Sequence, residues 1–172
     1  MIIKGDKIYL RSITYEDTSD IVRWRNSDFV RDRFIYRERF TEELHNDWMK
    51  NVVETGKAVQ FIMFEGTTGK KFGSVYLRDI DMKNKKCEFG IFIGEEEMSC
   101  KGYGREAALL ITEYAFNEMG INRIFLRVLS DNEIAIRSYQ RSGFTVEGTA
   151  REDVWIEDRP RDVLFMSKLK KE

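Results

Sequence analysis

The chain has 172 residues, enough for one domain with its own hydrophobic core, and we expect residues 1–172 to form a single domain. Its 29 Lys and Arg residues nearly balance its 30 Asp and Glu residues, which excludes the strongly basic surface typical of nucleic-acid and membrane-surface binding. The first residues are too charged for a signal peptide, and no apolar run reaches transmembrane length. Because Cys87 and Cys100 make no disulfide framework, a reduced, cytoplasmic setting is expected.

Strand patterns and capped helices follow one another in the first half of the chain. Residues 7–13 predict a first strand, followed by a helix over 14–26 that begins at Thr14 or Asp17. A second helix is predicted over 40–53, with a capping box at Thr41. Three strands, over 58–65, 71–81 and 85–94, then form an antiparallel meander.

The second half begins with a long amphipathic helix that Gly102 and Gly104 open. A strand over 122–129, a capped helix over 130–143 and a hairpin over 144–169 follow. A meander followed by a strand–helix–strand crossover predicts a mixed sheet with helices packed on it.

The two glycines before the long helix leave two interpretations open. The pattern Gly102-x-Gly104-x-x-Ala107 meets a dinucleotide fingerprint, but that fingerprint directly follows a strand, and here an acidic loop intervenes. Either the glycines only start the helix, or free N–H groups from Lys101 to Arg105 bind a pyrophosphate at the positive end of the helix dipole. The two flanking cations favour the second interpretation.

Two separated motifs resemble the GCN5-related N-acetyltransferase (GNAT) superfamily. The loop "SCKGYG" fits the family pattern (R/Q)-x-x-G-x-(G/A), except that Ser99 replaces the usual Arg or Gln. The segment "DNEIAIRSYQRSGF" fits N-x-x-A-x-x-x-Y-x-x-x-G-F at Asn132, Ala135, Tyr139, Gly143 and Phe144. The carboxy-terminal segments "VEGTARED" and "DVLFMSKL" are similar to the subgroup of ribosomal-protein N-terminal and spermidine acetyltransferases.

The resemblance implies an α/β fold of the α+β type. Its mixed, mostly antiparallel, twisted sheet would have about seven strands, with helices on both faces and a splayed parallel pair at the cofactor site. It also implies acetyl-CoA as donor and a primary amine that attacks the thioester directly, through a tetrahedral intermediate. No metal is expected, since one histidine and two separated cysteines make no usual zinc site. A homodimer is plausible from the family and from the apolar terminal hairpin.

The same resemblance implies which residues bind the cofactor. The strand end before the glycine loop would hold the pantetheine arm with free backbone groups, and the loop would hold the pyrophosphate. Asn132 is either a helix N-cap, which explains its residue type alone, or a cofactor ligand. The expected cofactor-binding residues are Ile91, Phe92, Ile93, Ser99, Lys101, Gly102, Tyr103, Gly104, Arg105, Asn132 and Ala135.

Two residues are candidates for the chemistry of acyl transfer. A tyrosine of pKa about 10 can protonate a leaving thiolate whose thiol has a pKa near 8.5, and Tyr139 is predicted to be this general acid. The alternative is a tyrosine of the core. Glu88, in the strand leading to the thioester, is predicted to deprotonate the amine or to anchor a cationic acceptor. Because strand side chains alternate, it can equally face solvent as a cross-strand partner.

The amino-terminal helices are expected to form the acceptor wall. The segments around Trp24, Arg25, Asn26, His45 and Trp48 resemble acetyltransferases that act on amino-sugar nucleotides. Helical core spacing explains the tryptophans equally well. A polyamine, an amino-sugar nucleotide and a protein N-terminus therefore stay open as acceptors, and a binding module that holds acyl-CoA without turnover is the alternative from another class.

Overall fold

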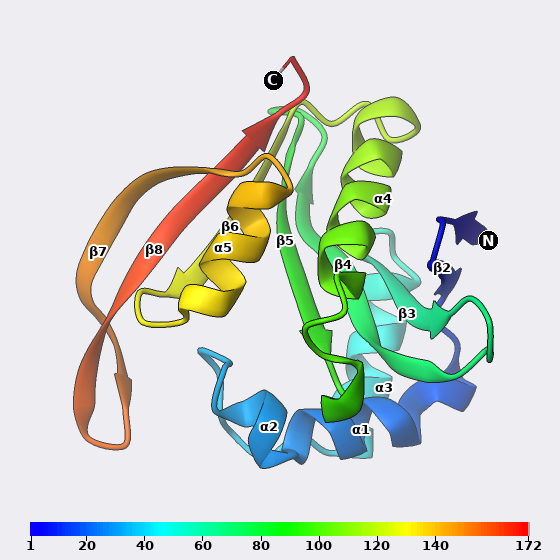
Figure 1. Cartoon of the computed structure of the whole chain (residues 1–172), viewed down its shortest axis with the longest axis horizontal. Coiled ribbons are helices and arrows are strands. Elements are labelled where there is room, and N and C mark those ends of the chain that lie inside the picture. Colours follow the sequence, from blue (N-terminus) through cyan, green and yellow to red (C-terminus); the bar gives the residue numbers. More distant parts are fainter. Residues whose placement is uncertain (172) are drawn as a thin grey trace.

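The computed structural model describes residues 1–171, and these form an eight-stranded sheet in the order β1-β2-β3-β4-β5-β6-β8-β7. Neighbouring strands run antiparallel except β5 and β6, which run parallel. Figure 1 shows β7 and β8 as a long arm at one side of the sheet. The strands are β1 Ile2–Lys4, β2 Ile8–Ser12, β3 Val59–Glu65, β4 Lys71–Asp81, β5 Lys86–Ile93, β6 Arg123–Leu129, β7 Thr145–Ile156 and β8 Arg159–Leu169.

The mixed, mostly antiparallel sheet is confirmed, with one correction to its size. The seven strands predicted from the sequence are present, and β1 adds an eighth by pairing antiparallel with β2. A strand of three residues beside a charged turn is too short to show the period-2 alternation that identifies a strand. The turn between β1 and β2 is held by Glu106, whose Oε1 accepts a hydrogen bond from the Lys7 backbone N–H at 2.9 Å.

The helices are α1 Thr18–Asn26, α2 Asp28–Arg31, α3 Glu42–Trp48, α4 Tyr103–Asn117 and α5 Glu133–Arg141. Thr14 and Asp17 form a reciprocal capping box at a short 3-10 turn, Tyr15–Asp17, that leads into α1. At the second helix the Thr41 side chain accepts from the Leu44 N–H as a simple N-cap, so the capping box predicted there is wrong, because Leu44 has no polar group to return the bond. The helix predicted over 40–53 is α-helical only to Trp48 and ends in a π-helical turn, and α2 was not predicted. Within residues 1–171, no helix is long and apolar enough to cross a membrane.

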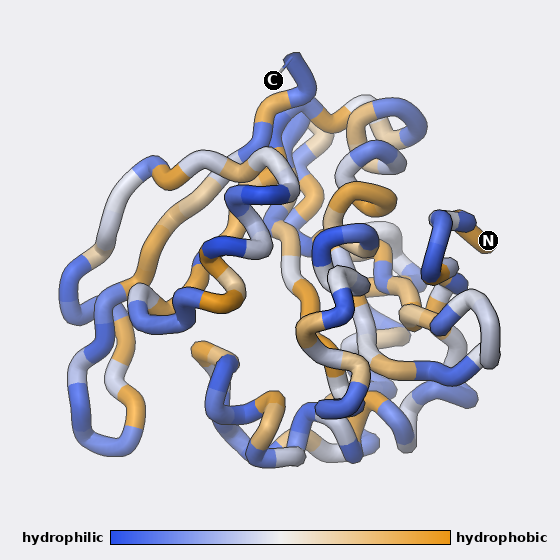
Figure 2. The backbone as a smooth tube through the Cα atoms, in the orientation of Figure 1, coloured by the Kyte–Doolittle hydropathy of each residue, from blue (hydrophilic) through white to orange (hydrophobic). Residues whose placement is uncertain are grey.

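Helices cover both faces of the sheet, as expected. The apolar side of α4, with Ala107 and Ile111, packs in one hydrophobic cluster with Phe72, Phe89 and other residues of the central strands. On the opposite face, α1 and the residues around α2 and α3 pack in a second cluster. Figure 2 shows the hydrophobic parts of the chain in the central strands and the hydrophilic parts mainly in the outer turns.

The parallel pair of β5 and β6 separates along its length. The two strands pair at only three positions, from Lys86 opposite Arg123 to Glu88 opposite Phe125. Beyond Glu88, β5 stays paired with β4 as far as Ile93, while β6 stays paired with β8 as far as Leu129. The edge of β5 that faces β6 therefore has no strand partner from Phe89 to Ile93, which confirms the splayed pair that the sequence predicts.

Candidate active site

The loop before α4 places a row of backbone N–H groups at the start of the helix. Gly102 is the N-cap residue and adopts the left-handed conformation, with φ of 84°. In residues 1–171, no acceptor is found for the N–H groups from Lys101 to Arg105. Gly104 has no positive φ, and a Cβ added there would meet only Ile93 Cδ1 at 3.7 Å. Neither backbone conformation nor crowding requires glycine at position 104, and its missing side chain leaves open space beside the free N–H groups.

Among the side chains of this loop, one packs against the core and two carry positive charge at the surface. Tyr103 packs its ring against Phe72, with centroids 5.3 Å apart. Lys101 and Arg105 are exposed and have no ion-pair partner in the described part of the chain. Ser99 closes a turn through its N–H, which donates to the Glu96 carbonyl at 2.9 Å. The loop thus offers free amides and two cations whose charge is unpaired within the described residues, although the Lys101 ammonium donates to Met98 Sδ at 3.7 Å, and this arrangement suits a pyrophosphate.

The strand end Ile91, Phe92 and Ile93 lies beside the separation of β5 and β6. Ile91 and Ile93 pack against the cluster beneath α4, whereas Phe92 belongs to the cluster on the opposite face. Their side chains are therefore held in the two cores. What they expose to the gap is the unpaired edge of their backbone, as expected for a strand that binds an extended ligand by main-chain hydrogen bonds.

Tyr139 lies on α5 with its ring against Phe89 and Phe144, at centroid distances of 5.8 and 6.1 Å. Its hydroxyl has no hydrogen-bond partner among residues 1–171. Burial raises the pKa of Tyr139, and the nearby Tyr76 adds to the shift. Asn132 is the N-cap of α5, and its Oδ1 accepts from the Ala135 N–H at 3.3 Å.

A cavity of about 300 Å³ lies on the other face of the sheet, between the amino-terminal helices and strands β3 to β5. Ile21, Leu44, Phe40 and Phe92 supply apolar lining, and His45, Trp48 and Gln60 lie at its wall. The remaining lining residues are charged or phenolic: Arg25, Tyr36, Glu38, Arg39, Tyr76 and Arg78. The volume and the mixture of aromatic and polar groups fit a small organic ligand.

The structure brings some of the predicted acceptor-binding residues to this cavity and gives others a different role. Arg25, His45 and Trp48 line it. Trp24 is only 1% exposed, and its indole N–H donates to Glu95 at 2.7 Å. Asn26 uses its side-chain amide to hold the backbone N–H and C=O of Phe40, at 2.8 and 2.7 Å. The Trp24 indole N–H and the Asn26 amide therefore serve the fold, and neither residue lines the cavity.

Glu88 is buried and binds two arginines. Arg78 donates to both of its oxygens at 3.0 and 3.1 Å, and Arg127 donates to Oε1 at 3.2 Å. Burial alone would raise the pKa of Glu88, but the hydrogen bonds and charges of Arg78 and Arg127 outweigh it and lower the pKa. The expectation that Glu88 can face solvent is wrong. It is the cross-strand partner of Arg78, and its lowered pKa makes it a weak base.

Tyr76 is a site residue that the sequence analysis missed. It lines the cavity, its hydroxyl has no hydrogen-bond partner within residues 1–171, and burial raises its pKa despite the nearby charges of Arg78 and Arg25. Its ring lies over Gly90, where any Cβ would collide with it. A glycine inside a strand pattern marks such a close approach, so Gly90 was the available signal.

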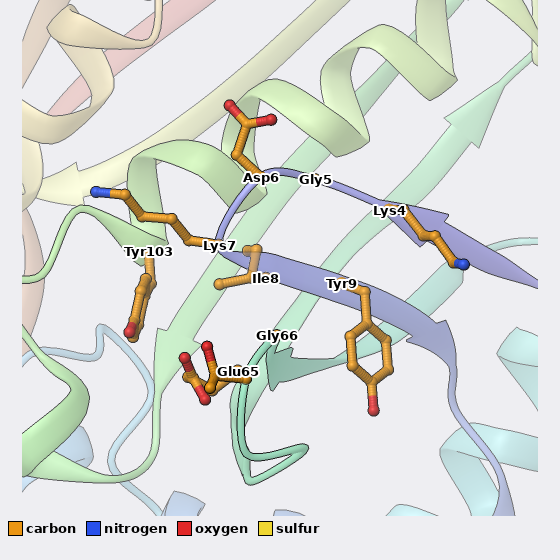
Figure 3. A pocket seen from close by; sticks show the side chains of 10 residues that line it. Lys4, Gly5, Asp6, Lys7, Ile8, Tyr9, Glu65, Gly66 and Tyr103 are labelled. Atoms are coloured by element: carbon orange, nitrogen blue, oxygen red, sulfur yellow. The ribbon is translucent and has the colours of Figure 1, made fainter.

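A second, larger cavity of about 570 Å³ lies beside the β1–β2 turn. Figure 3 shows Lys7 and Lys4 extending to opposite sides of it, with Glu65 and Tyr103 nearby. Strands β3 and β4 separate β2 from the parallel pair, and neither Tyr139 nor Glu88 lines this cavity. The smaller cavity, by contrast, is lined by Phe92 of β5 and by Arg78, the partner of Glu88, and we therefore assign the chemistry to it.

Known proteins place this chain in one family. The sequence model of the acetyltransferase (GNAT) domain matches residues 7–145. The putative ribosomal N-acetyltransferase YdaF of Bacillus subtilis is 27% identical over 135 residues, 78% of this chain and 72% of that protein. A spermidine N(1)-acetyltransferase of Vibrio cholerae is 30% identical over 125 residues, 73% of this chain and 69% of that protein.

A solved structure shares the fold over nearly the whole chain. The crystal structure of spermidine N-acetyltransferase from Vibrio cholerae in complex with CoA and spermine has a TM-score of 0.90 at 22% identity. The superposition covers 97% of this chain and 98% of that one. With the splayed pair, the free amides at α4 and the matching domain model, the chain belongs to the GNAT family of acetyltransferases and is an acetyl-CoA-dependent enzyme of that class.

Proposed function

We propose that this enzyme transfers the acetyl group of acetyl-CoA to a primary amine bound in the cavity between the amino-terminal helices and strands β3 to β5. One observation carries the proposal. The Tyr76 ring, at the cavity wall, lies over Gly90, and the Tyr139 ring packs on Phe89, the preceding residue of β5, so the cavity and the α5 face meet where β5 and β6 separate. Donor and acceptor can therefore approach from opposite faces of the sheet.

The free groups at the start of α4 supply the donor site. The amides from Lys101 to Arg105 would bind the pyrophosphate, and the unpaired edge of β5 would bind the pantetheine arm by main-chain hydrogen bonds. Such binding orients the thioester at the gap between the two strands. A backbone N–H of the same edge is a suitable donor to the oxyanion of the tetrahedral intermediate.

In the proposed reaction, the amine nitrogen bonds to the thioester carbon and the carbon–sulfur bond breaks. Tyr139 gives its proton to the leaving thiolate, and the proton released by the nitrogen restores the tyrosine, so no proton is gained or lost. The raised pKa of Tyr139 keeps its hydroxyl protonated at neutral pH. A thiolate held in the same low-dielectric surroundings is also destabilised, which limits the cost of taking the proton from the weaker acid.

Glu88 holds Arg78 and Arg127 in this proposal rather than acting as the base. Its two oxygens already accept hydrogen bonds from both arginines, and its pKa is lowered. Arg78 lines the cavity, so Glu88 positions a cation at the acceptor site. The amine then binds in its neutral form, which predicts that activity rises with pH as the free amine loses its proton.

Polyamines, amino-sugar nucleotides and protein N-termini are all primary amines and all fit the proposal. The spermidine acetyltransferase of Vibrio cholerae supports the first of these and the putative ribosomal N-acetyltransferase of Bacillus subtilis supports the last. We further propose that residues 1–172 act as one domain, as a homodimer, in the cytoplasm. A non-catalytic acyl-CoA-binding module is the alternative, favoured only by Ser99 in place of the usual motif residue.

Thiol release from acetyl-CoA, measured against a panel of primary amines, tests the function. Tyr139→Phe should lower kcat by about 100- to 10,000-fold, the usual contribution of a general acid, while acetyl-CoA affinity stays unchanged. Tyr114→Phe is a matched control, since Tyr114 also packs against a phenylalanine but lies on α4. Binding of acetyl-CoA without release towards any amine would contradict the proposal and favour the binding module.

A further inference from the structure

The guanidinium of Arg25 lies at the cavity with no partner for its charge. It stands over two aromatic rings, with Cζ 4.4 Å from the centroid of Phe34 and 4.9 Å from that of Phe40. Among residues 1–171, no carboxylate lies within ion-pair distance of Arg25 and no group accepts a hydrogen bond from it. The aromatic faces stabilise the cation but leave its N–H donors free.

The neighbouring arginines are arranged differently. Arg78 and Arg127 share Glu88, and Arg23 binds Glu95 at 2.7 Å and Asp20 at 3.2 Å. Burial lowers the pKa of Arg25, Tyr76 partly offsets this effect, and the charge of Arg78 adds to it. Keeping a half-buried charge without a counterion is unfavourable, and a ligand that supplies the anion would remove this cost.

The surroundings of Arg25 are fixed before any ligand arrives. The Asn26 amide holds both backbone groups of Phe40, and the Phe34 ring packs edge-on against Phe92 with centroids 5.8 Å apart. Both rings that carry the guanidinium are therefore anchored, one to α1 and one to β5. A guanidinium preorganised in this way loses little side-chain entropy on binding.

The cavity lining as a whole carries a net positive charge, like Arg25 itself. Arg25, Arg39 and Arg78 line it, and Glu38 is the lining carboxylate within the described residues. Glu88 does not reverse this balance, because it is shared by Arg78 and Arg127. The net positive charge of this cavity would repel a polycation and attract an anion.

We propose that Arg25 binds an anionic group of the acceptor, so that the acceptor class is a primary amine that also carries a carboxylate or a phosphate. This inference rests on the proposed function and narrows it. The planar guanidinium presents parallel N–H donors that match two oxygens of either anion. The unpartnered Tyr76 hydroxyl at the same cavity is a further donor. Polyamines, which carry no anion, are then poor substrates.

Matched pairs of amines test the inference. Glucosamine and glucosamine 6-phosphate differ by a phosphate, serinamide and serine differ by a carboxylate, and spermidine represents the polyamines. The anionic member of at least one pair should exceed its neutral twin in kcat/KM by about 10- to 100-fold, the value of a hydrogen bond to a charged group. Which pair responds tells whether the anion is a phosphate or a carboxylate.

Arg25→Met should abolish that ratio by lowering kcat/KM for the anionic member far more than for its neutral twin, without raising the KM for acetyl-CoA. Arg25→Lys keeps a cation and should retain part of the ratio, which excludes simple misfolding as the cause. Arg33→Met is the matched control, since the Arg33 guanidinium stands 4.2 Å from the Phe29 ring but does not line the cavity. It should behave like the wild type.

Calorimetric titration of glucosamine 6-phosphate and of serine into the enzyme with CoA provides a second readout that needs no turnover. Binding of one of them that Arg25→Met abolishes supports the inference even if acetyl transfer itself fails. Equal kcat/KM for the members of both pairs, a preference for spermidine, or an equal loss for all amines in Arg25→Met would overturn it. In those last three cases thiol release still occurs, and the acetyltransferase function stands.

Discussion

Three polar side chains at the acceptor cavity, Arg25, His45 and Tyr76, keep a donor or acceptor without a partner in residues 1–171. His45 is 1% exposed, and its Nδ1 lies 3.0 Å from the Thr18 hydroxyl, which joins α3 to α1. Its Nε2 has no hydrogen bond in the described chain. Among the described residues, His45 Nε2 is the fully buried atom of this set, and a buried polar atom is seldom left unpaired.

His45 should make stability depend on pH. Burial lowers the pKa of His45, partly offset by Asp17, so the ring is neutral in the fold and becomes protonated in the unfolded chain below about pH 6.5. The unfolded state then binds more protons. The free energy of unfolding should therefore fall as pH drops below 6.5, by up to about 1.4 kcal/mol per pH unit.

Urea unfolding between pH 7.5 and 5.5 measures this slope. His45→Asn should remove it, and because the chain has one histidine no other imidazole contributes. A slope that persists in the variant would assign the effect to other groups.

At the scale of the element, the two glycines at the start of α4 differ in why a glycine suits their positions. Gly102 has a φ of 84°, which side chains rarely adopt, whereas Gly104 has an ordinary backbone and open space beside it. The first glycine serves the turn into the helix. We expect the second to make room for the pyrophosphate at the free N–H groups.

Substituting each glycine with alanine should therefore affect different quantities. Gly102→Ala should lower the free energy of unfolding by about 1–2 kcal/mol, the strain of a left-handed alanine. Gly104→Ala should leave stability equal or raise it by up to about 1 kcal/mol, yet raise the KM for acetyl-CoA, because the methyl group occupies the approach to the amides. Thermal unfolding and initial rates distinguish the two, and a Gly104→Ala enzyme with unchanged KM would contradict the assigned pyrophosphate site.

At the scale of the whole molecule, the β7–β8 arm leaves one edge of the sheet open (Figure 1). Strand β7 is exposed along nearly its whole length, and Trp155 near the arm's tip is 71% exposed. An exposed edge strand offers free backbone groups, and an exposed tryptophan offers apolar area. Together they form the surface that we expect a second copy to cover.

Sedimentation velocity should show a dimer for the wild type and a shift towards monomer for Trp155→Asp. Met82→Asp is a suitable control, since Met82 is similarly apolar and 56% exposed but lies in the turn after β4. It should remain dimeric. A monomeric wild type would refute the prediction.

The sequence by itself determined the strands from β2 to β8, the caps at Thr41 and Asn132, and the glycine loop, because these depend on residues a few positions apart. It also predicted the splayed pair through resemblance. Only the tertiary structure decided which charges are satisfied. Glu88 meets arginines 10 and 39 positions away, and Arg25 meets none of the acids in residues 1–171. Pairing over such separations is set by sheet order and helix placement, which no local pattern encodes.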